Sequence, residues 1–227
     1  MKNNFLKARI ILPAVFLAGF FVFGVLGKGA KAAETISEDT VWNKGEVKII
    51  EGVEGLMVMP GATLTINPGV IIKMGANASI SIAGSLIAKG DSSDPIIFTS
   101  IKDDSAGGDT NGDGAASLPS RGDWSGIIFG GDELCSLDFD YVQIKYANIA
   151  IFANEMDNFS IAHSVITENS RAGIVLNSIN SGSINYSNIY SNYNPVSGCQ
   201  TQNGIYYCLD IAFRYYGDEP IDATNNY

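Results

Sequence analysis

The chain has 227 residues, of which 46% are hydrophobic and only 17% charged, so it is long enough to bury a substantial core. It carries 14 basic and 24 acidic residues, and the segment 1–33 holds five of the basic ones and no acid. The remaining chain therefore has nine basic and 24 acidic residues, a net charge of −15, which disfavours nucleic acid as a partner. One histidine and three cysteines exclude zinc sites rich in these ligands.

Residues 1–33 have the organisation of a secretory signal peptide. A basic stretch ending at Arg9 is followed by the apolar run Ile10–Leu26 and then by an Ala-Lys-Ala-Ala sequence. We expect this segment to be a helix outside the fold and to be cleaved after Ala32 or Ala33. The alternative is an uncleaved membrane anchor, because the apolar run is near the lower limit for crossing a bilayer. Both alternatives predict an extracellular or cell-surface protein, and it contacts a membrane, through this segment, only if the segment is not cleaved.

From residue 47 onward, short apolar runs alternate with turns rich in Gly, Asn, Asp, Ser and Pro, which predicts an all-β fold. The expected strands are Leu56–Met59, Ala62–Ile66, Val70–Met74, Ser79–Ala83, Ser85–Ala88, Ile96–Ile101, Ile127–Phe129, Phe139–Ile144 and Ile149–Phe152. Alternation within a run, such as Leu64-Thr65-Ile66, predicts one inward and one outward face for each strand.

Apolar residues also recur at fixed steps along the chain. In the first half, Ile50, Ile66, Ile82 and Phe98 follow one another at an equal spacing along the sequence, which we call the first-half step. A β-sandwich has no reason to repeat in this way, whereas a coil of stacked parallel strands requires it. We therefore predict one continuous parallel β-helix over residues 34–227, with these four residues stacked inward. An ordinary β-sandwich with chance spacing is the alternative.

In the second half the step is longer. It connects Ile144, Ile166, Ile189 and Ile211, and likewise Ile151 with Ile174. Asn169 and Asn192 keep the same step in the turns that follow, and we expect their side chains to form a hydrogen-bonded ladder between coils.

Five stretches of the sequence carry a resemblance to a known group: PGATLTINPGVIIKMG (60–75), GSLIAKGDSSDPIIFTS (84–100), DDSAGGDTNGDG (103–114), GDWSGIIF (122–129) and IDATNNY (221–227). Through them the sequence resembles right-handed parallel β-helix repeat proteins of bacterial surfaces, which are akin to pectate lyases in the pectin-lyase-like superfamily. The resemblance implies a right-handed β-helix but is unspecific for activity. In that group the Asn-Asn-Tyr segment commonly continues, so a domain truncated at its C-terminal end is a further expectation.

The sharpest local motif is Asp109–Gly114, which fits D-x-[DN]-x-[DN]-G. Oxygen-bearing side chains at alternate positions of this pattern converge on one cation. We predict a Ca²⁺ site in an inserted acidic loop, residues 103–122, with ligands drawn from Asp109, Asn111, Asp113, Asp103, Asp104 and Asp123. Ser120 stands where an EF-hand loop has glutamate, so an EF-hand is excluded; a solvated acidic loop without an ion is the alternative.

Cys199 and Cys208 bracket a short insertion in the second-half repeat. In an exported protein such a close pair predicts a disulfide that closes the loop. Cys135 is then left over, and the sequence does not decide between a buried small residue and pairing elsewhere.

Two functions remain open. The resemblance implies that an enzyme of the pectate-lyase type would bind Ca²⁺ through acidic residues and use a nearby basic residue to take a proton. The body has few basic residues, and its single histidine, His163 beside Ser164, has no nucleophile-elbow pattern around it. We therefore expect an exported, non-catalytic surface, adhesion or carbohydrate-binding module stabilised by Ca²⁺, with a polysaccharide or a cell-surface protein as partner. The alternative is a polysaccharide lyase or glycoside hydrolase.

Overall fold

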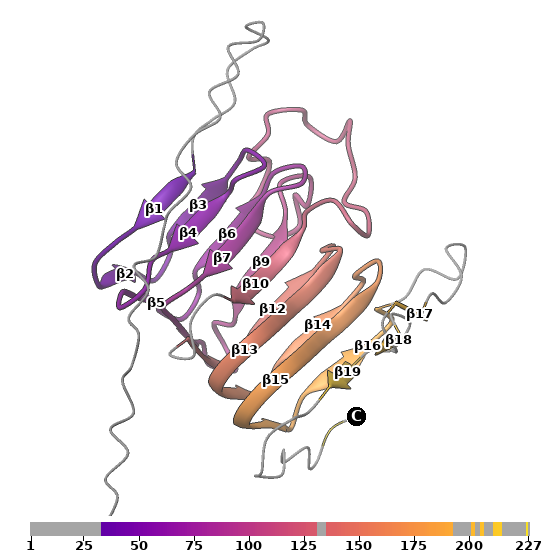
Figure 1. Ribbon diagram of the computed structural model, residues 1–227. Helices are drawn as coiled ribbons and strands as arrows, with labels where there is room; N and C mark the ends of the chain where they lie inside the picture. The colour runs from indigo at the N-terminus through magenta and orange to yellow at the C-terminus, as the bar shows by residue number, and fades with distance from the viewer. Residues whose placement is uncertain are drawn as a thin grey trace, which may run out of the picture.

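The computed structural model describes residues 33–130, 135–192, 201–202, 205–206, 211–214 and 226 (Figure 1). The expected signal helix lies outside these residues apart from Ala33. No helix in the described part of the chain is long and apolar enough to cross a membrane.

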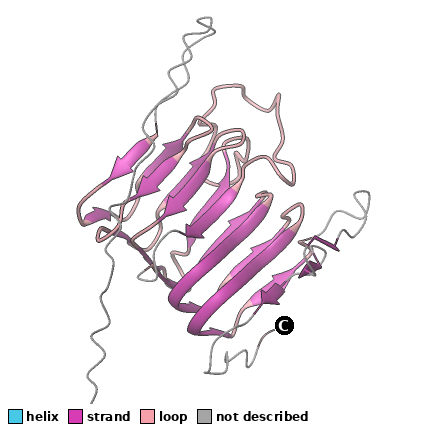
Figure 2. Ribbon diagram, viewed as in Figure 1, coloured by secondary structure: helices cyan, strands magenta, loops and turns pink. Residues whose placement is uncertain are grey.

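The strands stack into three rows that run along one axis, which makes the fold a parallel β-solenoid (Figures 1 and 2). Row one contains β1 (Glu34–Ile36), β4 (Leu56–Val58), β7 (Ser79–Ile82), β10 (Gly126–Gly130), the first parts of β13 (Ile149–Ala162) and β15 (Ala172–Asn185), and β19 (Ile211–Arg214). Row two contains β2 (Thr40–Trp42), β5 (Thr63–Ile66), β8 (Ser85–Lys89), β11 (Ser136–Asp140) and the second parts of β13 and β15.

Row three is a separate six-stranded sheet, and its six strands mark six coils. It contains β3 (Val47–Ile50), β6 (Ile71–Met74), β9 (Ile96–Ser100), β12 (Val142–Lys145), β14 (Val165–Thr167) and β16 (Asn188–Tyr190). A short antiparallel pair, β17 (Thr201–Gln202) with β18 (Ile205–Tyr206), lies outside the rows. The all-β parallel solenoid predicted from the sequence is thus confirmed.

The prediction that Ile50, Ile66, Ile82 and Phe98 lie one coil apart is wrong. Ile50 and Phe98 lie in row three, Ile66 in row two and Ile82 in row one, so the four do not stack on one another. A full coil is longer and takes Leu64 to Leu86, or Ile72 to Phe98. Because a coil contains three strands of similar spacing, the shorter step moves two strands further round and arrives at another buried position.

The longer step of the second half is confirmed. Ile144, Ile166 and Ile189 pair in row three, and Ile151 pairs with Ile174 in row one. Ile211 departs from the prediction, because it continues row one beside Ile174 instead of following Ile189.

The predicted asparagine ladder is also present. Asn169 Nδ2 donates to Asn192 Oδ1 at 2.7 Å, and Asn169 Oδ1 accepts from the Ala147 N–H at 2.8 Å. Both asparagine side chains are fully buried, so the ladder satisfies backbone groups at a turn that water does not reach.

The first coil closes the N-terminal end of the core with a charged side chain. Lys48 occupies the register position of the buried Ile72, at the start of the inward ladder of row three. Its Nζ lies 5.3 Å from the centre of the Trp42 ring and 2.7 Å from Glu46 Oε2. The lysine side chain therefore covers the Trp42 ring at the first described coil.

Candidate metal-binding loop

The predicted insertion is a long loop between β9 and β10 that projects beyond the ends of the stacked strands (Figures 1 and 2). Ser79 pairs with Gly126, so this coil is much longer than the ones that take Leu64 to Leu86 or Ile72 to Phe98. At Gly107 a Cβ atom would lie 3.4 Å from side-chain carbons of both Ile71 and Val47. The loop backbone therefore packs directly against β3 and β6.

Asp123 ties the two ends of the loop together. Its Oδ1 lies 2.8 Å from Lys102 Nζ, and its Oδ2 accepts hydrogen bonds from Ser100 Oγ at 2.8 Å and from the Ser120 N–H at 2.9 Å. Because both carboxylate oxygens are engaged at the neck of the loop, Asp123 acts as a structural clasp.

Asp103 lies beneath the loop and is only 2% exposed. Its Oδ2 accepts from Thr99 Oγ1 at 2.6 Å and lies 3.4 Å from Lys145 Nζ, while its Oδ1 accepts from Ser105. Burial pushes the pKa of this carboxyl upward, but the bonds from Ser105 and Thr99 and the charge of Lys145 outweigh it, so the pKa is lower than usual.

This lowered pKa predicts an acid-sensitive fold. A carboxyl whose folded pKa is depressed contributes stability above its unfolded value, about 3.9, and loses it as the pH falls through the folded value. We expect Asp103→Asn to lower stability at neutral pH and to flatten the fall in unfolding free energy below about pH 4. Urea unfolding of both proteins across this range is the measurement, and parallel pH profiles would contradict the assignment.

Lys73 binds the inserted loop from below through its ammonium group. Its side chain is fully buried on the outward side of β6, and Nζ donates to the carbonyls of Asp103 at 2.6 Å and Gly108 at 3.0 Å. Burial lowers the pKa of Lys73, and the charges of Asp103, Asp104 and Asp109 oppose that shift. The sequence motif gave no sign of this lysine, because it lies more than a full coil before its partners.

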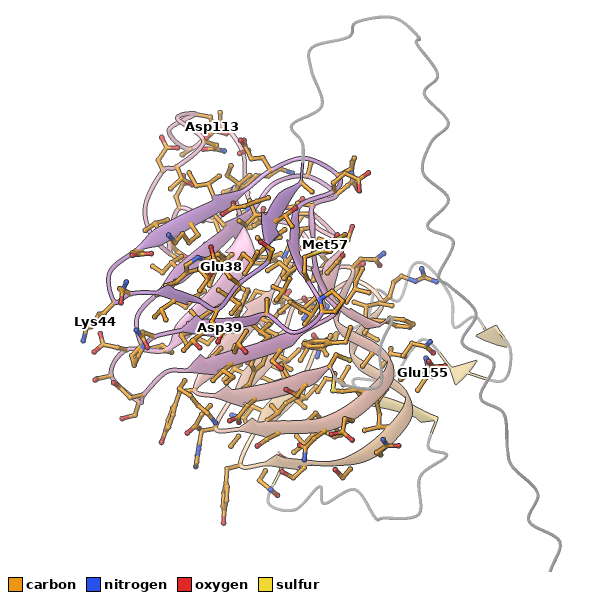
Figure 3. The ribbon with its side chains drawn as sticks, turned by 60° about the vertical axis from the view of Figure 1, so that its left-hand side comes forward. Glu38, Asp39, Lys44, Met57, Asp113 and Glu155 are labelled. Carbon is orange, nitrogen blue, oxygen red and sulfur yellow. The ribbon has the colours of Figure 1, made fainter. Side chains whose placement is uncertain are left out.

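The loop brings three carboxylates together, and one of them, Asp113, lies at its tip, away from the stacked strands (Figure 3). Oxygen atoms of Asp104, Asp109 and Asp113 lie within 4.8 Å of one another, so these residues, here called the Asp triad, could hold a metal ion. Asp109 accepts from the N–H groups of Gly112 at 2.7 Å and Gly114 at 2.8 Å. The bond from Gly114, followed by the one from Gly112, lowers the pKa of Asp109 and keeps it charged.

Two oxygens of the Asp triad have no hydrogen-bond donor. Asp104 Oδ1 and Asp113 Oδ1 are shielded from solvent, and neither has a hydrogen-bond partner. A buried anionic oxygen without a partner is costly, and neighbouring carboxylates repel one another. A bound cation would remove both penalties. The set of oxygen ligands fits a hard cation such as Ca²⁺ or Mg²⁺.

Of the six predicted ligands, the structure thus brings together Asp104, Asp109 and Asp113. Asp103 and Asp123 lie at the base and the neck of the loop, outside the Asp triad. Asn111 lies at the tip, but its amide nitrogen faces the triad: Nδ2 donates to Asp113 Oδ2 at 2.9 Å and to Ser117 Oγ at 3.1 Å.

A ladder of aromatic rings, missed by the sequence reading, follows the turn between rows two and three. The His163 ring stacks between Tyr141 and Tyr186 at centroid distances of 4.7 and 5.3 Å, and His163 Nδ1 lies 2.8 Å from Asp140 Oδ1. The sequence did contain a signal for this ladder, because the three aromatic residues recur at the same spacing as the apolar residues of the second half. Ser164 is buried and donates to the Ala162 carbonyl, so His163 and Ser164 have separate partners.

One outward register line of row one is mainly apolar. Met57, Ser81, Ile128, Phe152 and Val175 follow one another in register along the axis. A hollow of about 230 Å³ opens on it; its lining is Met57, Ser81, Ile82, Ala83, Ile128 and Gly130. Among the described residues, none that lines this hollow is acidic.

The predicted disulfide between Cys199 and Cys208 lies outside the described residues. Cys135 is buried, and its Sγ lies 3.3 Å from the Glu155 carbonyl oxygen.

Comparison of the chain with protein-family models, with curated proteins and with solved structures found no match.

Proposed function

We propose that the protein is an exported, non-catalytic β-helix module of the cell surface, right-handed as in the pectin-lyase-like superfamily, whose inserted loop binds Ca²⁺. The observation that carries the calcium proposal is the pair of shielded carboxylate oxygens, on Asp104 and Asp113, that have no hydrogen-bond donor. The carboxylates of Asp103, Asp109 and Asp123 accept hydrogen bonds within the loop, and so does the other oxygen of Asp113, Oδ2. A cation at the two orphaned oxygens would supply the partner that they lack.

Ca²⁺ fits this place better than Mg²⁺ or a softer metal. The Asp triad supplies only oxygen ligands, from an exposed loop whose backbone carbonyls and water can complete a shell of about six to eight oxygens. Mg²⁺ demands a stricter octahedral geometry, and transition metals favour nitrogen or sulfur ligands. When bound, Ca²⁺ would hold the tip of the loop closed.

A binding role is supported by how the basic residues near the acids are used. Lys73 donates to backbone carbonyls, Lys102 pairs with Asp123, and Lys145 pairs with Asp103. All three lysines thus have a structural role, and none is held ready to take a proton from a substrate. A partner would meet the apolar surface of row one around Met57 and Ile128. Such a surface suits a neutral polysaccharide or an apolar protein surface better than a polyanion.

Thermal unfolding with Ca²⁺ and with chelator tests the metal site. Ca²⁺ at a hundredfold excess over its Kd should stabilise the native state by about 2.7 kcal/mol, because it binds the folded loop alone. Asp104→Asn and Asp113→Asn should each abolish the calcium-dependent shift, whereas Asp138→Asn, which alters a carboxylate of row two paired with Lys89, should keep it. Equal midpoints with Ca²⁺ and with chelator would overturn the calcium proposal.

The enzyme alternative is tested separately. The purified protein, loaded with Ca²⁺, is incubated with acidic polysaccharides, and the absorbance of unsaturated products is followed. No product is expected; a steady release of such products would replace the module proposal with a polysaccharide lyase.

A further inference from the structure

The tip of the inserted loop contains an Asn-Gly dipeptide, and its asparagine, Asn111, is exposed. Asparagine before glycine is prone to cyclise, because glycine has no Cβ to hinder the approach of its backbone nitrogen. The Gly112 nitrogen loses its proton and bonds to Asn111 Cγ, and Nδ2 takes up a proton and leaves as ammonia. Water then opens the cyclic imide at either carbonyl, which leaves aspartate or isoaspartate at position 111.

Both reacting groups are held by other partners in the folded loop. The attacking nitrogen is engaged, since the Gly112 N–H donates to Asp109 Oδ1 at 2.7 Å. The leaving group is engaged as well, since Asn111 Nδ2 donates to Asp113 Oδ2 and Ser117 Oγ. A hydrogen bond to a carboxylate opposes loss of the Gly112 proton, so Asp109 acts directly on the first step.

We propose that Asn111 is a site of spontaneous deamidation that Asp109 keeps slow by holding the Gly112 N–H. Conversion to aspartate replaces the amide donor facing Asp113 with a fourth carboxylate beside the Asp triad. This consequence rests on the proposed calcium function, whereas the deamidation itself rests only on the hydrogen bonds of the loop. Newly made and aged protein would then differ in how strongly the loop requires a cation.

The experiment is peptide mapping by mass spectrometry of the purified protein incubated at neutral pH with chelator. In Asp109→Ala, deamidation at Asn111 should be about tenfold faster than in the wild type, because a charge-assisted hydrogen bond has been lost. Asp109→Asn keeps an oxygen that can accept from Gly112 but loses the negative charge, so its rate should lie between those of the wild type and Asp109→Ala. The second Asn-Gly dipeptide of the chain, Asn203-Gly204, serves as an internal reference in every sample.

Asp104→Asn is the matched control. It removes a carboxylate of the Asp triad but contacts neither reacting group, so its rate should equal that of the wild type. Equal acceleration in Asp104→Asn and Asp109→Ala would overturn the proposal by showing general loosening of the loop, as would a wild-type rate in Asp109→Ala.

The calcium consequence is read out on the same samples. Deamidated protein, separated by ion exchange, should show a larger Ca²⁺-dependent shift in unfolding midpoint than intact protein. If Asp109 controls deamidation but neither form responds to Ca²⁺, the deamidation site stands and the proposed calcium function fails.

Discussion

Replacing Gly126 with alanine should cost the fold about 4 kcal/mol, the largest effect we expect from a single methyl group. Gly126 begins β10, where the chain returns from the inserted loop to row one, and its φ is 127°. A Cβ there would lie 1.8 Å from the Ile149 carbonyl oxygen of the next coil. Because that oxygen belongs to the backbone of a packed strand, two coils must separate to admit the methyl group.

Chemical unfolding followed by circular dichroism measures the loss, and Gly130→Ala is the matched control. Gly130 ends the same strand and has no positive φ, and among the described residues an added Cβ would meet only Asn154 O, at an ordinary 3.7 Å. Its substitution should change stability by no more than about 0.5 kcal/mol. Similar losses in the two variants would show that the close approach at Gly126 is not the cause.

The solenoid could be predicted from the sequence because each coil must return apolar residues to the core. The regular second half revealed its step directly through Ile144, Ile166 and Ile189. The spacing of apolar residues in the first half gave the wrong coil length. Each coil there has three strands of nearly equal spacing, so an advance of two strands returns an apolar residue just as a full coil does. Only the backbone register, such as Ile72 beside Phe98, distinguishes the two.

The tip of the loop was partly predictable for a different reason. The motif from Asp109 to Gly114 is local, so chain geometry alone brings its side chains together. Asp103 and Asp104 are neighbours in sequence, yet one is buried under the loop and the other joins the Asp triad. That division depends on Thr99, Lys73 and Lys145, which occupy the same outward ladder in three coils and could not be aligned without the register.

Lys73 is the side chain on which this arrangement depends most, and Lys73→Met should lower stability by about 3 kcal/mol. Methionine fills a similar volume but donates no hydrogen bond, so the carbonyls of Asp103 and Gly108 lose their partner. The buried Asp103 carboxylate also loses a nearby positive charge. The loss should appear in urea unfolding, together with faster proteolysis within residues 101–123.

Lys89→Met provides the control, because Lys89 is an exposed lysine whose salt bridge to Asp138 lies at the surface. That variant should stay within about 0.5 kcal/mol of the wild type. Lys73→Met should also respond more strongly to Ca²⁺, since removing the internal cation leaves the surroundings of Asp104 and Asp109 more negative. A Lys73→Met protein as stable as Lys89→Met would mean that the loop is held by its neck at Asp123 alone. The buried lysine would then only fill space beneath it.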